Sequence, residues 1–466
     1  MKERCAAALL VLAASGCTAG PDYQVPDDAV ANARAAQGTF VNGDSPAFAQ
    51  APLPDHWWRL YDDPRLDLYV GEALAANTDL RAAEANLRRA NAAISEAEAA
   101  QTVGTSIQSS ITDTRQGGID TLSFPGWSYS LGGGVSYALD LAGGIRRTIE
   151  AARADAESVQ AIRDEVRVTV AAAVARNYVA VCTANLSIAA AQRVVDVQSQ
   201  TRDDVHRLFR GGRSTAFDVT RAQTAVDQST ATIPPLIARR QASLYALAAL
   251  MGQPVAQYPR ELQVCPSPPS LRRPLPVGDG GDLIRRRSDV RAAERSLAAA
   301  TATIGIETAQ LYPQVSIGGA LGIAGPFDTI GSASSYGGNI GPLLSWTFPN
   351  LSATHARIAE AGAAADAAKA RFDNTVLTAL QQTETALDGY VREIEHNREL
   401  RTARDSAAKA TSQARALFRF GRTGVLDVLN AEANLAAAET AVAASDTALA
   451  DEQVNVFLAL GGGWEP

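Results

Sequence analysis

Residues 127–140, WSYSLGGGVSYALD, alternate between two kinds of side chain. The odd positions hold Trp, Tyr, Leu, Gly, Val, Tyr and Leu, whereas the even positions hold Ser, Gly, Ala and a final Asp. Because successive side chains of a strand point to opposite faces, the stretch predicts a β-strand with one apolar face and one small, polar face. Its aromatic ends and its length of about ten residues are typical of strands that cross a bilayer. An ordinary sandwich strand with one buried face has the same alternation.

Three further stretches alternate in the same way. Together the four predicted strands cover about residues 102–114, 127–140, 313–324 and 335–348. Four strands cannot close a membrane barrel, since the smallest bacterial barrels use about eight, and open sheet edges are not tolerated in hydrocarbon. We therefore expect several copies of the chain to share one barrel. The aromatic residues that we expect at the membrane interfaces are Trp127, Tyr137, Tyr336 and Trp346.

Two very long helices follow the strand pairs. The chain has neither Gly nor Pro between Gly144 and Gly211, which predicts a helix over about 145–210, about 100 Å long at the standard rise of 1.5 Å per residue. A second helix without proline is predicted over about 352–420. Helices of this length are typical of coiled coils, stalks or tunnel walls. After the first turn, a return helix to about Met251 should be kinked at Pro234-Pro235.

The sequence repeats itself at an offset of about 209–210 residues. DLRAAEANL (79–87) returns as DVRAAERSL (289–297), and a Gly-Arg-Ser/Thr turn followed by Asp-Val returns in the same order. A constant offset across helix, strand and turn indicates a tandem duplication of a helix–strand–strand–long helix–turn–helix unit. The predicted division is a signal peptide at 1–16, an extended lead-in at 17–63, a first repeat at 64–251, a Pro/Gly-rich linker at 252–281 and a second repeat at 282–466.

The cysteines belong to two different settings. Lys2 and Arg4, an apolar run and Ala14-Ser15-Gly16-Cys17 predict an export signal, after which Cys17 would become an acylated N-terminal residue. Plain signal cleavage with Cys17 unmodified is the alternative. Cys182 lies in a helical stretch and Cys265 in a Pro-rich segment, so we expect two unpaired thiols, although an oxidising compartment would allow them to pair.

Composition and motifs argue against several functions. The net charge of -8 argues against nucleic-acid binding. The four histidines lie far apart in sequence without paired ligand spacing, and the chain has no P-loop, no GxGxxG opening a strand–helix unit and no GxSxG. The chain contains no uninterrupted run of 18 apolar residues, so the sequence predicts no transmembrane helix. We therefore expect no enzyme, no metal and no cofactor, apart from the covalent lipid on Cys17.

Several stretches together resemble the TolC-like outer-membrane efflux family, and most closely its OprM/NodT-type lipoprotein branch. They cover nearly the whole chain in the family's order: the lipobox at Cys17, WWRLYDDPRLDLYVGEALAANTDLRAAEANL (57–87), YALDLAGGIRR (137–147), LYPQVSIGG (311–319), both turns, and LALGGGW (458–464). The resemblance implies a mainly α fold with a transmembrane β-barrel. In a homotrimer, twelve strands would close the barrel in outer-membrane lipid, and the long helices would form a periplasmic α-barrel.

The resemblance also implies partners and a site. A closable periplasmic tip would bind an adaptor (membrane fusion) protein, which is tied to an inner-membrane transporter of the RND type. The residues expected at the tip and its docking surface are Gly211, Gly212, Arg213, Asp218, Gly421, Arg422 and Asp427. The residues expected at a gate are Asp203, Asp204, Arg415 and Arg419, with a solvated surface as the alternative for the two aspartates.

The expected function is a passive exit duct that exports small toxic compounds, with its energy supplied by a partner. An exit duct for protein secretion of type I is an alternative within the same class. A structural coiled-coil lipoprotein without a pore is an alternative of a different class. Four strands with one lipid-compatible and one wet face favour a duct, because a structural stalk has no use for them.

Overall fold

The computed structural model describes residues 18–114, 126–265, 268–271 and 273–462. The predicted signal peptide 1–16 and Cys17 lie outside the described residues, as does most of the loop between the first two strands. The short elements are α2 Arg34–Gln37, β1 Phe48–Ala49, β4 Leu275–Pro276, α8 Gly280–Arg286, and the 3₁₀ turns Val30–Asn32, Trp57–Tyr61, Val255–Gln257, Arg260–Val264, Phe327–Thr329 and Ala333–Ser335.

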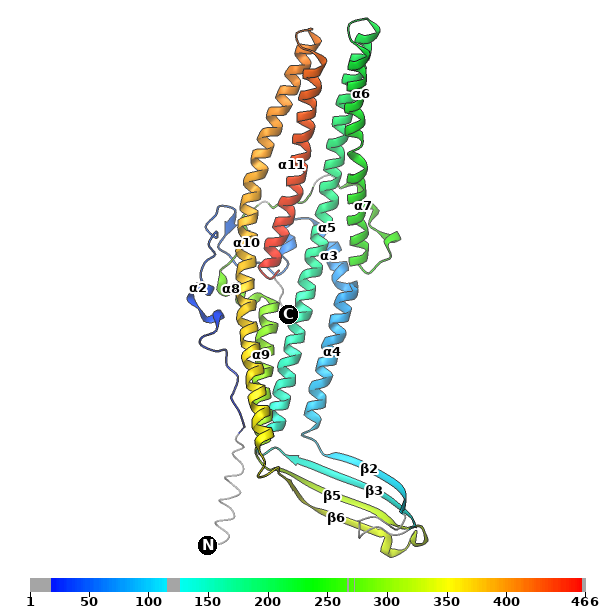
Figure 1. Cartoon of the computed structure of the whole chain (residues 1–466), viewed down its shortest axis with the longest axis vertical. Helices are drawn as coiled ribbons and strands as arrows, with labels where there is room; N and C mark the ends of the chain where they lie inside the picture. The colour runs from blue at the N-terminus through cyan, green and yellow to red at the C-terminus, as the bar shows by residue number, and fades with distance from the viewer. Residues whose placement is uncertain (1–17, 115–125, 266–267, 272, 463–466) are drawn as a thin grey trace. The chain divides into compact units, whose positions relative to one another are not determined.

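The longer elements repeat in one order, as Figure 1 shows. The first repeat holds α3 Pro64–Ala76, α4 Thr78–Ala99, β2 Gly104–Thr114, β3 Gly126–Leu139, α5 Gly144–Arg210, α6 Ala216–Thr230 and α7 Ile233–Leu250. The second repeat holds α9 Ser288–Ala309, β5 Gln314–Pro326, β6 Tyr336–Ser345, α10 Ser352–Arg419 and α11 Val425–Ala459. The predicted fold class, a tandem repeat dominated by long helices with four strands, is confirmed.

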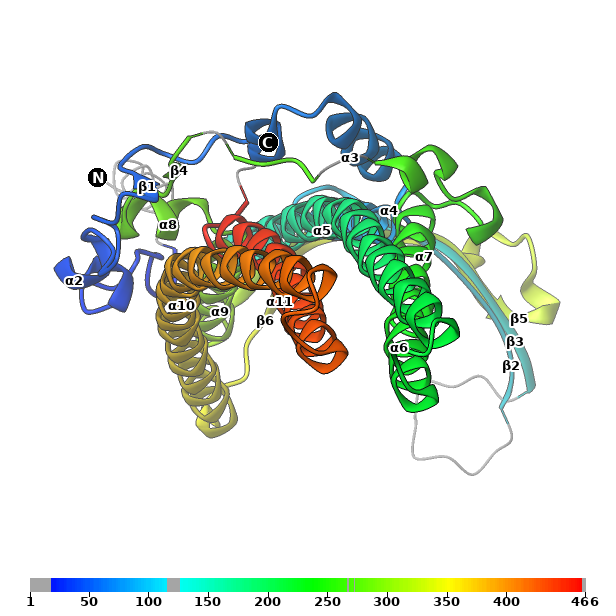
Figure 2. The same ribbon diagram turned by 90° about the horizontal axis from the view of Figure 1, so that it is seen from above.

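The four long strands form one antiparallel sheet in the order β2-β3-β5-β6. Its register keeps the two predicted faces apart. Ile107 lies opposite Gly133, which lies opposite Leu321, whereas Ser106 lies opposite Gly134, which lies opposite Ala320. The alternation of apolar and polar residues predicted for each strand is therefore in phase from strand to strand across the sheet. The sheet is curved, as the path of β2, β3 and β5 in Figure 2 shows.

The chain divides into two compact units that share its longest helices. The first unit holds the described residues up to Ala29 together with Ala85–Gln160 and Ala292–Asn374, and so contains the sheet. In it, the Arg147 guanidinium binds the residues that follow Cys17: Nε donates to Ala19 O at 3.0 Å and Nη2 to Asp22 Oδ1 at 2.7 Å. This buried arginine fixes the start of the described chain to the first turn of α5.

The second unit holds Val30–Glu84, Ala161–Arg291 and the residues from Thr375 onward. Its core is centred on Trp57, whose ring stacks on Phe457 of α11 at 4.4 Å between centroids. Part of the predicted lead-in thus belongs to the core, and an extended lead-in is the wrong description for residues 30–63. The predicted linker is also integrated, because β1 and β4 pair in parallel, Phe48 with Leu275.

Helical segments are interrupted at three places in the structure. The helix that begins at Pro64 ends at Ala76, because the Asn77 side chain accepts hydrogen bonds from the Asp79 and Leu80 N–H groups and starts α4. Arg287 separates α8 from α9 at the equivalent place in the second repeat. The return helix is interrupted between Thr230 and Ile233, next to Pro234-Pro235 as the sequence predicted, while Ala231 and Thr232 keep helical backbone angles. Pro234-Pro235 fits the first turn of α7, where its missing N–H groups are not needed.

Cys182 and Cys265 form a disulfide, so the prediction of two unpaired thiols was wrong. The two Cα atoms lie 5.2 Å apart. The turn Arg260–Val264 carries Cys265 to α5, where the Asn185 side chain donates to the Leu262 and Cys265 carbonyls at 3.2 and 3.3 Å. Different sequence settings therefore did not prevent the two thiols from meeting.

Among the described residues, one helix, α5, contains an 18-residue window apolar enough to cross a membrane by length and composition, and 39% of that window is buried. The window is not an uninterrupted apolar run, so the expectation drawn from the sequence stands. A helix that packs into a core passes the same test, and α5 packs into the core of the second unit around Val174 and Val179.

Candidate functional site

The apolar face of the sheet is exposed. Its aliphatic side chains project freely, with Ile107 at 84% and Ile340 at 85% of full exposure. A soluble domain would bury such a face against another layer, because burying apolar area is the main favourable term in folding. Within the described chain Phe327 packs against Tyr129 near one end of the face. The aliphatic side chains of the other strands remain open, so this face is suited to lipid.

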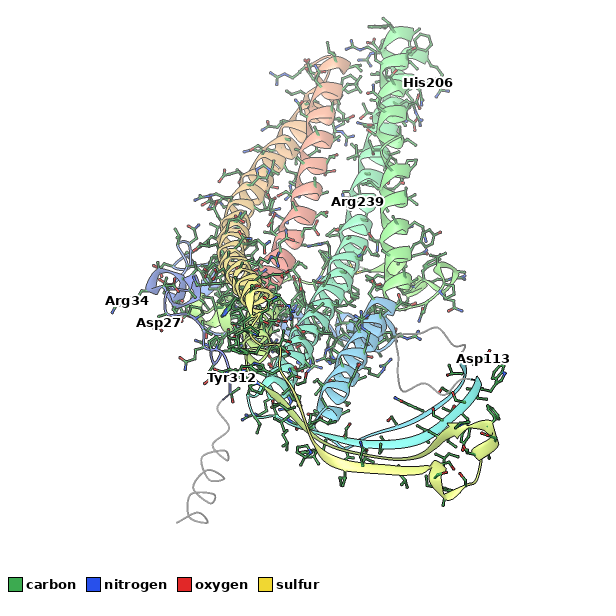
Figure 3. The ribbon with its side chains drawn as sticks, turned by 60° about the horizontal axis from the view of Figure 1, so that its bottom comes forward. Asp27, Arg34, Asp113, His206, Arg239 and Tyr312 are labelled. Carbon is green, nitrogen blue, oxygen red and sulfur yellow. A yellow bond between two sulfur atoms is a disulfide. The ribbon has the colours of Figure 1, made fainter. Side chains whose placement is uncertain are left out.

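Aromatic side chains lie near both ends of this face. Trp127 and Tyr336 are exposed near one end, and Tyr137 and Trp346 near the other. Figure 3 shows the two ends at Asp113 and Tyr312. Ten residues separate Trp127 from Tyr137, about 33 Å along a strand, and a tilt of about 40° reduces this to about 25 Å of height. The spacing equals the apolar band of an outer-membrane strand.

The opposite face of the sheet is lined by small and polar residues. It borders a hollow of about 760 Å³, with Ser106, Gln108 and Ser130 on one side and Asn339 on the other. Gly, Ala and Ser between them leave room next to the backbone. Leu343 is the exception, a large apolar side chain on this face. The face is suited to water, and the sheet as a whole to a wall between lipid and an aqueous passage.

Two helical turns form the tips of the second unit, at the same end of its helices in Figure 1. Each ends a long helix in the same way. The Gly212 N–H donates to Phe209 O and the Arg213 N–H to Leu208 O, while Gly421 and Arg422 repeat both bonds. Gly212 and Gly421 have φ values of 69° and 66°, which glycine adopts without strain. His206, labelled in Figure 3, lies close to the first of these turns.

Both predicted tip aspartates act inside the turns. Asp218 Oδ2 accepts from the Thr215 N–H at 3.0 Å and from the Ser214 hydroxyl at 3.0 Å, and Asp427 Oδ2 accepts from the Gly424 N–H at 3.3 Å. Hydrogen bonds from the Thr215 side chain and then its backbone N–H lower the pKa of Asp218. These carboxylates shape the tips, because each fixes the start of the returning helix.

The four predicted gate residues do not form one cluster within the chain. Asp203 pairs with Arg202 at 2.7 Å and Asp204 pairs with Arg207, so both aspartates bind arginines of their own helix. Arg419 is exposed and has no ion pair among the described residues.

Arg415 instead joins the two hairpins. Its Nε donates to Glu432 Oε1 of α11 at 2.8 Å, and its Nη2 donates to Val197 O and the Thr201 hydroxyl of α5 at 2.7 and 3.1 Å. Glu432 has only 1% of its side chain exposed and also accepts from the Thr201 hydroxyl at 2.6 Å. Below the turns, Val205, Ala222 and Leu429 form a small apolar cluster between the same hairpins. We call Arg415, Glu432, Thr201 and Val197 the interhelix node.

Two cavities, of about 270 and 160 Å³, lie between the hairpins farther from the tips. Both border Ser187 and Ala190 of α5 and Glu439 of α11, and the larger also borders Arg239, labelled in Figure 3. Burial raises the pKa of Glu439 and the nearby Arg193 and Arg404 oppose this. The seam is therefore loosely packed here, in contrast to the interhelix node.

Sequence reasoning named Arg415 as a gate residue but missed its contacts between the hairpins. It did not single out the contacts of Arg147 or Glu432, and it favoured unpaired thiols over the Cys182–Cys265 disulfide. Among the described residues there is no group of three or more His, Cys, Asp or Glu side chains that could hold a metal ion. The geometry is that of a wall and a tip, not of a reaction centre.

The family comparison covers most of the chain. The family model described as outer membrane efflux protein matches residues 69–253 and 281–462, one segment in each repeat. The chain belongs to the outer membrane efflux protein family. It is accordingly an outer-membrane channel that extends into the periplasm, and not an enzyme.

Individual relatives agree with this assignment. Nodulation protein T of Rhizobium leguminosarum bv. viciae is 29% identical over 470 residues, covering 99% of this chain and 94% of that protein. The pyoverdine export outer membrane protein OpmQ of Pseudomonas aeruginosa is 28% identical over 88% of this chain and 87% of its own. The outer-membrane channel OprN has a similar solved structure, with a TM-score of 0.87 and 32% identity, covering 97% of this chain and all of that one.

Proposed function

We propose that this chain is the exit duct of a tripartite efflux pump, passively exporting drugs or other small toxic compounds. Three copies would close a twelve-stranded barrel, dock a periplasmic adaptor and receive substrate from an inner-membrane transporter of the RND type. The observation that carries the proposal is the sheet with one exposed apolar face and one small, polar face. Among the described strands, β2 and β6 each pair on one side only, which leaves edges that hydrocarbon does not tolerate.

Small organic substrates are supported by the names of relatives. One relative exports pyoverdine, and another, from Pseudomonas putida, is a toluene efflux pump outer membrane protein that is 26% identical over 96% of this chain. Among the described residues that line the hollow beside the sheet, none carries a charge that would select one compound. Selection is therefore assigned to the transporter, and passage to this chain.

A lipid on Cys17 is part of the proposal. Its support is the sequence around Cys17 and the fixed position of the residues that follow, since the Ala19 N–H also donates to Ala142 O at 2.9 Å. Mass spectrometry of the mature N-terminal peptide tests the modification. Detection of a peptide with unmodified Cys17 would refute the lipid anchor and leave the proposal of a duct intact.

We assign resting closure to Asp203 and Asp204, which would face one another around the threefold axis of a trimer. A carboxylate ring favours cations and narrows the passage. Single-channel recordings of the full-length protein in planar bilayers test duct and gate together. We expect small, cation-selective conductance that rises when both aspartates are replaced by alanine.

Asp196→Ala provides the matched control, because Asp196 is exposed on the same helix and binds only Gln192 among the described residues. Its conductance should equal that of the wild type. If the double variant conducted as the wild type does, the gate would have to be assigned to residues other than Asp203 and Asp204. The absence of conductance in every variant, with the protein correctly assembled, would count against a duct.

A further inference from the structure

The larger of the two cavities between the hairpins, of about 270 Å³, is walled by three helices of one chain. α5 contributes Ala190 and Val194, α7 of the first hairpin contributes Leu236, and α11 of the second hairpin contributes Ala443. All of its lining residues belong to the second unit. The cavity is therefore built by a single chain, without residues from a neighbouring copy.

Two opposite charges line this cavity without pairing with each other. Its charged lining residues are Glu439 of α11 and Arg239 of α7, the latter labelled in Figure 3. Within the described chain no ion pair joins the two, and Glu439 Oε2 is buried without a hydrogen-bond partner. Burying a carboxylate oxygen without a partner is costly, because the oxygen loses its water. A positively charged group inside the cavity would remove this cost.

The rest of the cavity wall is small and largely apolar. Most of the other lining residues are alanine, serine or threonine, whose short side chains leave space between the helices. An apolar cavity of about 150 Å³ holds benzene, so this one has room for a ring of that size with charged groups attached. A mostly apolar wall with a few polar groups is typical of small-molecule sites.

A void left by imperfect helix packing is the plain alternative. The break between α6 and α7 lies beside the cavity, at Ser229 and Thr232, and accounts for part of its volume. A packing void does not account for the buried oxygen of Glu439, because folding gains nothing from it. Burial raises the pKa of this carboxyl, and Arg193 and Arg404 oppose the rise without donating a hydrogen bond to the buried oxygen.

We propose that this cavity binds a zwitterionic small molecule of the amino-acid class, with its ammonium group on Glu439, its carboxylate on Arg239 and an apolar side chain between the alanines. Both charges of such a ligand are matched, and both bonds are charge-assisted. The site goes beyond the proposed function, because its ligand lies between helices and not in the passage beside the sheet. Since Arg239 belongs to the first hairpin and Glu439 to the second, the bound molecule ties the hairpins together.

Phenylalanine, phenethylamine and 3-phenylpropanoate are the probes. They share a phenyl ring and carry both charges, only the cation and only the anion, respectively. Isothermal titration calorimetry of the full-length protein in detergent at neutral pH measures their binding. We expect phenylalanine to bind at least about tenfold more tightly than either analogue, since each analogue lacks one charge-assisted hydrogen bond.

Three substitutions separate the parts of the site. Glu439→Gln should remove the advantage of phenylalanine over 3-phenylpropanoate, and Arg239→Gln its advantage over phenethylamine. Ala443→Leu fills the cavity from α11 and should abolish binding of all three probes. Ala190→Leu fills it from α5 and provides the same test should Ala443→Leu fail to fold.

Matched controls carry the same changes outside the cavity. Ala437→Leu lies on an exposed position of α11, and Glu399→Gln on an exposed position of α10. Both should bind phenylalanine as the wild type does. Phenylalanine should also raise the unfolding temperature of the wild type and of both controls, because it binds the folded state, and should leave that of Ala443→Leu unchanged.

Equal affinity for the three probes would overturn the proposal, as would binding of none of them. Phenylalanine binding that both cavity-filling variants retain would also overturn it, since the molecule would then lie elsewhere, for example in the passage. None of these results depends on conductance. A protein that conducts but shows no preference for phenylalanine refutes the cavity site and leaves the duct intact.

Discussion

The two repeats build the same tip on differently supported hairpins. In the first, the return arm is broken into α6 and α7, and the Cys182–Cys265 disulfide ties α5 to the segment after α7. In the second, α11 returns as one helix of 35 residues. The turns have kept their backbone bonds and their Gly-Arg pair, whereas the arms have diverged. The shared part is therefore the tip, which indicates that both turns perform one task.

The second hairpin is held by a polar seam in place of a covalent bond. The Asn397 amide of α10 donates to Ser445 Oγ and Asp446 Oδ1 of α11 at 3.1 and 2.7 Å, and Arg401 binds Asp446 at 2.6 Å. Buried polar pairs of this kind fix the register of two helices, because sliding would leave them without partners. One hairpin is thus fixed by a crosslink near its base and the other by register.

Breaking the interhelix node should have the largest effect on this comparison, because the node is a polar contact between the two hairpins that contains the buried Glu432 carboxylate. Arg415→Met leaves Glu432 buried without its cation, and removing one partner of a buried pair costs about 3–5 kcal/mol. We expect a lower unfolding temperature and increased single-channel conductance. Thermal unfolding and bilayer recording measure the two effects.

The double variant Arg415→Met, Glu432→Met separates the two contributions. Replacing both charges by apolar side chains should recover most of the stability, since no charge is then left buried. Conductance should remain raised, because the link to Val197 and Thr201 is still absent. A single variant as stable as the double variant would show that Glu432 is not dependent on Arg415.

Removing the disulfide should have the second largest effect. The resulting loss of stability should be confined to the first hairpin. Cys182→Ser with Cys265→Ser opens a loop with a sequence separation of 83 residues, and loss of a disulfide costs about 2–5 kcal/mol. Unfolding temperature with and without reductant is the measurement. Reductant should destabilise the wild type and leave the double serine variant unchanged. A wild type indifferent to reductant would argue against the crosslink.

Substitutions at the residues that start the returning helices should change the stability of the tips least. The change should lower the stability of the first tip and raise that of the second. Thr215→Ala removes a side-chain cap and should destabilise the first tip by about 1 kcal/mol. Gly424→Ser should stabilise the second tip by about a few tenths of a kcal/mol, since Gly424 has an ordinary φ of -83° and a Cβ there meets only Asp427 Oδ2, at 3.9 Å. Hydrogen exchange of the tip amides measures both. A stability change of the same sign in both tips would contradict the difference between the two helix starts.

The first tip should also lose stability in acid. The pKa of Asp218 is lowered by hydrogen bonds from Thr215, so its contribution is present above its unfolded pKa and is lost as pH falls through its lower, folded pKa. Asp218→Asn should therefore destabilise the first tip at neutral pH. The difference from the wild type should shrink as pH falls below about 4 and disappear only below the lowered pKa of folded Asp218. Tip-amide exchange across that range tests the sign.

Local patterns predicted most of the fold. Alternation in residues 127–140 identified the two faces of the sheet, and the duplicated Gly-Arg turns identified both tips. The break at Asn77 had a readable signal, because Asn77-Thr78-Asp79 is a typical helix start. Each of these features is determined by residues that lie close together along the chain. A single sequence is therefore enough to predict them.

Contacts between distant residues could not be predicted. Arg415 and Val197 are 218 positions apart, and nothing in either local sequence indicates the other. The disulfide joins a helix to a segment whose path depends on Asn185 and on the packing of Leu262. For the same reason the sequence could not indicate which groups the predicted gate aspartates bind within the chain, where Asp203 and Asp204 each pair with an arginine of their own helix.

The disulfide also changes what a cut in the chain would do. Cys182 and Cys265 enclose the first turn in a covalent ring, whereas no crosslink among the described residues encloses the second. A protease that cleaved beside Gly212 would leave one connected molecule. Cleavage beside Gly421 would cut the covalent link of α11 to the rest of the chain and leave it held by noncovalent contacts, among them the packing around Phe457, the polar seam and the interhelix node. The first tip can thus be nicked in the periplasm without losing a piece, and the second cannot.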